Sequence, residues 1–254
     1  MPIDLATLTS LDARGYDVRE ALSWEGRTSP TTHSAAHTFI CVDGKTYWVK
    51  GRAQQGLVSE LIGGRLAARV GAGPVARIIR VTPEATPADG SADHLIGVVV
   101  GSEDEQNVIN NRDLDRLAAR DFDAQLVDPR ARALVVAFQT WIGVGDVQVL
   151  INLKSGKIRS IDHGECFTAT QQLTAPSLNL VSIKGVPDTL GNEAASVAAA
   201  ADQIEAVTDQ QILDAVAGIP LGDPWKSPAS RRLEIATWLA GRRRMVREVM
   251  EQWA

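Results

Sequence analysis

The stretch "WIGVGDVQVLINLKSGKIRSIDHGECF", residues 141–167, carries the strongest structural signal in this chain. Apolar, β-rich runs flank Lys154-Ser155-Gly156 and predict a hairpin, and Asp162-His163-Gly164 ends its second strand. A glycine turn is enough to explain an aspartate at such a place. The competing interpretation is that Asp162 holds a metal ion, because carboxylates are preferred ligands of hard cations. Residues elsewhere in the chain must decide between the two.

The overall composition is that of an ordinary globular protein. The chain has 254 residues, of which 44% are hydrophobic and 22% charged, and its formal net charge is −5. Such a composition can bury a sizeable core, and the negative balance argues against nucleic acid as a partner. The one dense basic run, Arg242-Arg243-Arg244, falls in an expected amphipathic helix and is interpreted as a solvated face.

The cysteines and the N-terminus indicate a reducing compartment. Cys41 and Cys166 show no CxxC or Cys/His spacing, so they are expected to be buried free thiols rather than a disulfide or a zinc site. The N-terminal residues are too polar for a signal peptide, and no apolar run reaches the length of a membrane span. We therefore expect a soluble, cytoplasmic protein with no membrane partner.

The first part of the chain predicts a small sheet with one helix. Residues 1–23 are expected to be a short helix or extended lead-in, and residues 25–37 a loop of small polar residues. Asp43-Gly44 predicts the turn of a hairpin over 38–51, in which Trp48 and Lys50 share a face. A helix over 56–73 and strands within 74–83 and 94–103 follow.

The second part is mostly helical. Apolar spacing predicts helices over 112–126, 129–142, 190–206, 208–217 and 228–252, with the hairpin of 147–162 between the second and third. The fold class is therefore α+β: a lead-in (1–23), a small antiparallel β-rich N-lobe with one helix (24–102) and a larger helical C-lobe (103–254).

Four charged residues in this framework have ordinary explanations when taken singly. Lys50 ends a strand, Glu60 lies early in a helix where the macrodipole favours it, and Asp146 and Asp162 fit turns. Their order along the chain is more specific. A strand lysine, a glutamate in the next helix, a loop acid and a hairpin ending in Asp-x-Gly follow the order of protein-kinase-like phosphotransferases.

The motifs that carry these residues resemble the HipA-like branch of the protein-kinase-like fold, which is also similar to phosphatidylinositol kinases. They are "YWVKG" (47–51), "SELIGGRLAARVGAGPV" (59–75), "GVVVGS" (97–102) and residues 141–167, within a span of roughly 25–170. The resemblance implies a two-lobed fold with a catalytic β-hairpin. It also implies that ATP and Mg²⁺ bind between the lobes and that phosphate passes to a Ser or Thr hydroxyl.

The resemblance also implies roles for individual residues. Lys50 would hold the phosphates and pair with Glu60, Asp146 would be the catalytic base, and Asp162 with Gln148 would bind Mg²⁺. The family's loop usually reads Asp-Arg-x-x-x-Asn, whereas this chain has Asp146-Val147-Gln148. Gln148 therefore stands in for the asparagine, and Asn152 is the competing candidate.

The remaining cofactor-binding residues are expected on a loop and a strand. The loop "SPTTHSAAH" (29–37), with Thr32 and Ser34, would cover the phosphates through hydroxyl and backbone N–H groups. Val100 and Ser102 of "GVVVGS" would contact the nucleotide just before the crossover between lobes.

Two functions follow from this reasoning. The first is an active HipA-like kinase that transfers the γ-phosphate of ATP to a protein. The second, suggested by the shortened loop at Asp146, is a catalytically weak or inactive kinase-like module that binds nucleotide or a regulatory protein partner. An unrelated α+β domain with coincidental acids is a third possibility. The phosphate acceptor, autophosphorylation and the oligomeric state leave no legible signal in the sequence.

Overall fold

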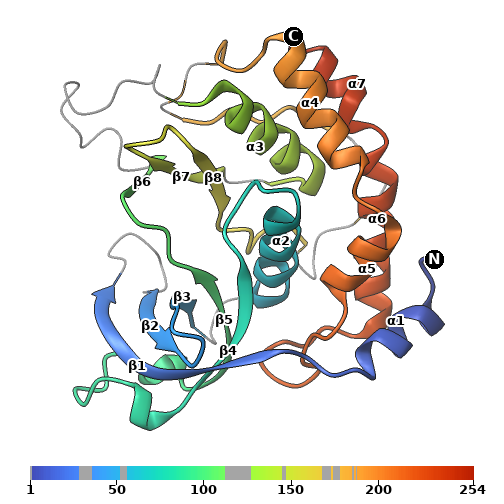
Figure 1. The fold of residues 1–254 in the computed structure, drawn as a ribbon. Coiled ribbons are helices and arrows are strands. Elements are labelled where there is room, and N and C mark those ends of the chain that lie inside the picture. Colours follow the sequence, from blue (N-terminus) through green and yellow to red (C-terminus); the bar gives the residue numbers. More distant parts are fainter. Residues whose placement is uncertain are drawn as a thin grey trace.

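The computed structural model describes residues 2–28, 36–51, 56–111, 127–144, 147–167, 173, 178–184, 186 and 188–254. Most of the strands lie in its first half, and helices dominate the second (Figure 1). The helix expected over 112–126 lies outside the described residues. The elements are α1 (Leu5–Asp12), β1 (Val18–Thr28), β2 (His37–Cys41), β3 (Thr46–Lys50), α2 (Leu57–Arg69), β4 (Ala76–Val81), η1 (Pro83–Ala85), η2 (Asp93–Leu95), β5 (Gly97–Glu103), β6 (Val108–Asn110), α3 (Pro129–Ile142), β7 (Gln148–Asn152), β8 (Ile158–Ile161), α4 (Ala194–Glu205), α5 (Asp209–Val216), α6 (Ala229–Arg243) and α7 (Val246–Glu251).

Five strands close into a barrel in the order β1-β2-β3-β5-β4. The hairpin predicted around Asp43-Gly44 joins β2 to β3, and Gly44 has the positive φ of +74° that this turn requires. Tyr47 and Val49 point into the barrel and are buried there, so Trp48 and Lys50 occupy its outer face as the alternation predicts.

The barrel differs from the predicted antiparallel sheet in its first strand. β1 begins at Val18, so residues 18–23 of the expected lead-in and residues 25–28 of the expected loop are in fact strand. β1 pairs in parallel with β4 and closes the sheet, with Val18 opposite Ile78. Register shifts along its pairing with β2 break the simple alternation of buried and exposed residues. The sequence of β1 therefore lacks the alternating pattern by which a strand is predicted.

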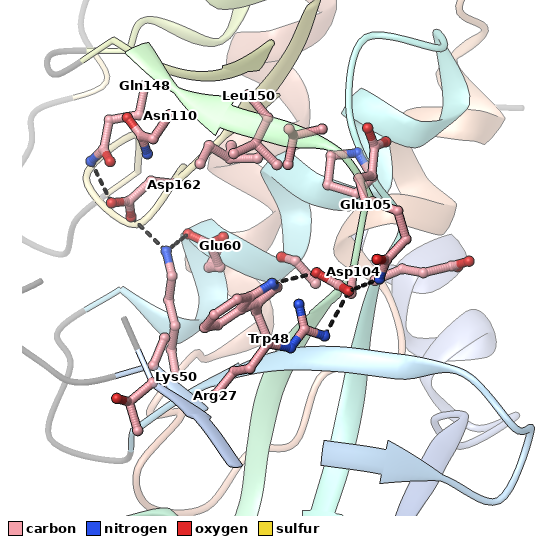
Figure 2. Close-up of a pocket in the computed structure, with 18 of the residues that line it drawn as sticks. Arg27, Trp48, Lys50, Glu60, Asp104, Glu105, Asn110, Gln148, Leu150 and Asp162 are labelled. Carbon is pink, nitrogen blue, oxygen red and sulfur yellow. Dashed lines mark hydrogen bonds and ion pairs between the residues drawn. The ribbon is translucent and has the colours of Figure 1, made fainter. Parts of the chain in front are cut away.

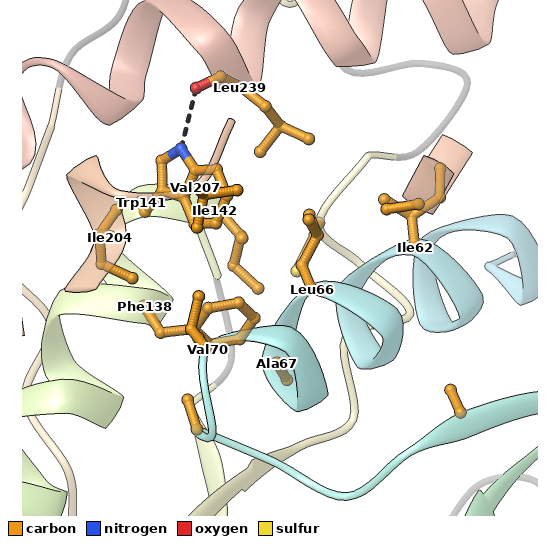
Figure 3. Packing of buried hydrophobic residues seen from close by; sticks show 14 of the residues in the cluster. Ile62, Leu66, Ala67, Val70, Phe138, Trp141, Ile142, Ile204, Val207 and Leu239 are labelled. Carbon is orange, nitrogen blue, oxygen red and sulfur yellow. Dashed lines mark hydrogen bonds between the residues drawn. The ribbon is translucent and has the colours of Figure 1, made fainter. Parts of the chain in front are cut away.

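Helix α2 lies between the barrel and helices α3–α7 (Figure 1). Its apolar residues join the main hydrophobic core, where Leu66 and Ala67 pack near Phe138 and Trp141 of α3 (Figure 3). The Trp141 indole N–H donates to the Leu239 carbonyl of α6 at 2.8 Å, which gives this buried polar group a partner. The core therefore fixes α2 against the helical part of the molecule.

A second, three-stranded sheet has the order β6-β7-β8. The hairpin predicted from residues 147–162 forms its β7 and β8, with Gln148 opposite Ile161. Asn152 caps the hairpin turn, because its side-chain oxygen accepts the amides of Lys154 and Ser155 at 3.0 and 2.9 Å. This sheet faces the barrel across a pocket.

The basic run on α6 is not the solvated face that the sequence suggested. Arg242 is buried, and its guanidinium donates to the carbonyls of Thr140 and Trp141 at 2.6 Å each. Arg243 is also buried and binds the Val207 carbonyl and Asp209. Both arginines thus satisfy carbonyl groups at or just beyond helix ends, where cations are favoured.

Candidate functional site

Lys50 lies between two carboxylates, one ten residues away in the sequence and the other 112 residues away. Its Nζ atom is 3.1 Å from Oε2 of Glu60 on α2 and 2.6 Å from Oδ1 of Asp162 after β8 (Figure 2). The side chains of Lys50 and Glu60 are only 15% and 4% exposed. Although burial would lower the pKa of Lys50, the two carboxylates raise it, so the ammonium stays charged. The ion pair predicted between Lys50 and Glu60 is present.

Gln148 completes the surroundings of Asp162. As the first residue of β7 it places its Nε2 atom 2.5 Å from Asp162 Oδ2, so each carboxylate oxygen has its own donor. Burial would raise the pKa of Asp162, but Lys50 and Gln148 outweigh it and hold that pKa below its ordinary value. The two residues expected to bind a metal thus lie in contact, and the hairpin is what brings them together.

The backbone at Asp162 answers the question raised by Asp-His-Gly. Asp162 has a φ of +58°, a left-handed conformation that aspartate tolerates better than most residues. Residues in such conformations are held by their surroundings and gather at functional sites. Here the holding contacts come from Lys50 and Gln148, so the local bend turns the carboxylate toward the pocket.

His163 supports this bend from the inside. Its buried ring shares a hydrogen bond of 2.8 Å with Ser160 Oγ. It packs edge-to-face against Phe138, with 5.6 Å between the ring centroids. Gln139 donates to the same hydroxyl at 3.1 Å. Burial lowers the pKa of His163 and favours the neutral ring. His163 is therefore a structural neighbour of the site.

The N-terminal half of α2 packs directly on residues 162–167. A Cβ atom on Gly56 would overlap the Gly164 carbonyl, and one on Gly63 would overlap His163. The Phe167 amide donates to Ser59 Oγ at 3.3 Å. These close contacts explain Gly56 and Gly63 of "GLVSELIGG", and they fix Glu60 relative to Asp162.

The cluster forms one end of a pocket of about 490 Å³ between the barrel and the β6-β7-β8 sheet. This volume is within the range of small-molecule sites. The charged end holds Lys50, Glu60, Asp162 and Gln148, and the opposite end is rimmed by the connector after β5 (Figure 2). Between them the lining includes Ala36, Trp48, Pro74, Val108, Leu150 and Ile161.

The other predicted residues fall in three places. Ser102 lines the pocket, whereas Val100, opposite Lys50 in the strand pairing, is buried in the main core and does not. Thr32, Ser34 and Asp146 lie outside the described residues. Asn152, engaged in the hairpin turn, does not line the pocket, which leaves Gln148 as the amide beside Asp162.

Sequence reasoning missed two asparagines on and after β6. Asn110 lines the pocket near Gln148 (Figure 2). Asn111 is buried, and its side chain accepts the Val149 amide at 3.0 Å and reaches the Val147 carbonyl at 3.5 Å. It therefore holds the backbone on both sides of Gln148. The run "NVINN" gave a weak signal, because its strand β6 has only three residues, too few for a periodicity.

Comparisons with known proteins assign the chain to a family. The model of HipA-like kinases matches residues 28–236, most of the chain. The chain belongs to the HipA-like kinase family. Among solved structures, the Helicobacter pylori proinflammatory kinase CtkA superimposes with a TM-score of 0.55 at 10% sequence identity, over 93% of this chain and 97% of that one. A Golgi casein kinase gives a TM-score of 0.40 at 12% identity, over 98% and 75%. No curated protein matches the sequence.

Membership of the HipA-like kinase family implies a nucleotide and a divalent metal, and the site can be tested for both. In the part of the chain that the structure describes, no group of three or more His, Cys, Asp or Glu side chains could hold a metal ion. Asp162 and the Gln148 amide do offer the oxygen donors that Mg²⁺ prefers, in a site where phosphate oxygens and water usually complete the shell. The residues present therefore fit a metal that arrives with a nucleotide.

None of the described helices is long and apolar enough to cross a membrane.

Proposed function

We propose that this chain is a kinase that binds Mg²⁺ and ATP in the pocket and transfers the γ-phosphate to a Ser or Thr hydroxyl of a protein. The observation that carries the proposal is Lys50, held between Glu60 and Asp162 at the charged end of a pocket with apolar walls. A triphosphate needs a fixed cation at one end of its site, and a base needs apolar surface next to that end. The pocket offers both.

Each residue would have a separate task. Lys50 would bind the phosphates, and Glu60 would keep the ammonium in place when Asp162 turns to the metal. Asp162 and Gln148 would hold Mg²⁺, which neutralises charge on the phosphates. The Gln148 amide would have to turn for this role, since its nitrogen now faces Asp162. Asp146 would accept the proton of the attacking hydroxyl. A cytoplasmic protein substrate is part of the proposal.

The test is transfer of labelled γ-phosphate by the purified chain to itself and to generic protein substrates, with Mg²⁺. Asp162→Asn and Lys50→Met should abolish transfer, while Glu248→Gln, on the exposed face of α7, should leave it unchanged. Thermal unfolding of each variant would show that it folds. Wild-type transfer by Asp162→Asn would refute the assignment of the site.

One observation favours the second function, nucleotide binding without transfer. α3 ends at Ile142 and β7 begins at Gln148, so the loop that contains Asp146 is very short. Stabilisation of the fold by Mg-ATP with no transfer to any acceptor would support this binding module. Stabilisation together with transfer would support the kinase.

A further inference from the structure

Trp48 is the largest side chain on the pocket's wall and has no role in the phosphate chemistry described above. It lies two residues before Lys50 on the outer face of the barrel and pairs with Ser102 of β5. Both Trp48 and Lys50 line the pocket. The strand alternation therefore puts the indole beside the charged cluster rather than inside the barrel core.

The indole is held in place by a buried carboxylate. Its Nε1 atom donates to Asp104 Oδ1 at 2.6 Å, and the Asp104 side chain is only 4% exposed. Asp104 Oδ2 accepts from Arg27 at 2.8 Å and from Gln106 at 2.6 Å. The Arg27 guanidinium also lies over the Trp48 ring, 5.4 Å from its centroid. One carboxylate thus ties together β1, β3 and the connector after β5 (Figure 2).

An aliphatic wall faces Trp48 across the pocket. Strands β6, β7 and β8 each contribute one apolar side chain to it: Val108, Leu150 and Ile161. Figure 2 shows Leu150 and Trp48 on opposite sides of the site, with Lys50 and Asp162 toward one end. A slot with an aromatic wall and an aliphatic wall suits a flat ring, which can stack on the indole while its polar substituents reach the charged end.

We infer that Trp48 is the residue that binds the nucleotide base, by stacking, and that Asp104 is a positioning residue that holds the indole for it. The inference rests on the proposed function, because it assumes that the phosphates lie at Lys50. The physical reason is preorganisation: a ring already fixed at its N–H and covered by a guanidinium loses little freedom when a base stacks on it. Stacking is also tolerant of base identity, so this wall favours planar bases in general.

The test separates the base from the phosphates by comparing Mg-ATP with Mg-tripolyphosphate, which has no base. Affinities are measured by calorimetry on the whole 254-residue chain. Trp48→Ala should weaken ATP binding roughly 5- to 150-fold, the effect of losing one stacked base. It should leave tripolyphosphate binding unchanged, because that ligand uses only the Lys50 end. Trp48→Phe should fall between, since it keeps a smaller ring.

Asp104 is tested with a matched pair of variants. Asp104→Asn retains an oxygen that can accept the indole N–H, whereas Asp104→Ala frees the indole. We expect Asp104→Ala to weaken ATP, but not tripolyphosphate, and Asp104→Asn to recover most of the loss. A merely structural role would weaken both ligands together, and that result would overturn the assignment.

The outcomes also distinguish this inference from the proposed function. If the wild-type chain binds neither ligand, the proposed function fails and the inference falls with it. If tripolyphosphate binds and ATP binds no more tightly, the phosphate site stands and the base slot is refuted. ATP affinity unchanged in Trp48→Ala would refute the role of Trp48 alone.

Discussion

The ion pair between Lys50 and Glu60 should be measurable as a coupling free energy in the absence of any ligand. At 3.1 Å and an effective dielectric constant of about 20, two unit charges attract by about 5 kcal/mol. Desolvation of two side chains that are 15% and 4% exposed removes much of this. Hydrogen bonds to charged groups contribute about 1.5–3 kcal/mol net, and we expect the coupling to lie in that range.

A double-mutant cycle is needed because Lys50 has two partners. Lys50→Met breaks its contacts with Glu60 and Asp162 together, whereas Glu60→Gln affects only the first. Comparing both single variants with the double variant by urea denaturation isolates the pair. The exposed pair Lys45–Glu103, at 2.8 Å, is the control and should give about 0.2–1 kcal/mol. A Lys50–Glu60 coupling below about 0.5 kcal/mol would show that the two charges are not paired in solution.

Three further substitutions test the rest of the structure. Arg232→Met should lower the free energy of unfolding by about 3 kcal/mol, because Asp12 would lose two hydrogen bonds at 2.6 and 2.8 Å; urea denaturation showing under about 1 kcal/mol would contradict this. Burial and, to a lesser extent, the neighbouring His94 lower the pKa of His37 in the folded protein. The contribution of His37 to the free energy of unfolding is therefore complete above the unfolded pKa of 6.5. It is lost as the pH falls below that value, because the unfolded chain then binds the proton more readily than the folded one. His37→Phe should flatten this decline between about pH 7 and pH 5, and equal slopes would refute it. Asn111→Leu should cost about 1–3 kcal/mol by leaving a buried backbone amide unpaired, again measured by urea denaturation, and a neutral effect would argue against its hold on the loop around Gln148.

Local pattern was enough to predict the elements that carry the site. The Asp43-Gly44 turn and strand alternation placed Lys50 and Trp48 on one face, and the spacing of leucines gave α2 with Glu60 in its first turn. The hairpin that ends in Asp162 was legible for the same reason. These features depend on neighbours within a few residues, which the sequence displays directly.

Features that depend on distant partners could not be predicted. β1 was missed because its closing contact is a parallel pairing with β4, more than fifty residues away, and because its burial does not alternate. Arg242 was misjudged because an arginine in a sequence does not show where its long side chain ends. Here the guanidinium reaches the carbonyl end of α3 and lies 4.2 Å from the Trp238 ring centroid.

The cluster around Lys50 combines side chains from two parts of the fold, and a movement of one part relative to the other would change its ion pairs. The barrel supplies the cation through β3, whereas α2 and the segment after β8 supply both anions and pack on each other through Gly63 and His163. A displacement of α2 that keeps this packing would carry Glu60 and Asp162 together and lengthen both contacts to Lys50 at once. The ion pairs therefore report the position of the barrel relative to α2. A ligand whose phosphates bind Lys50 while its metal binds Asp162 would stabilise the arrangement in which Lys50, Glu60 and Asp162 lie close together.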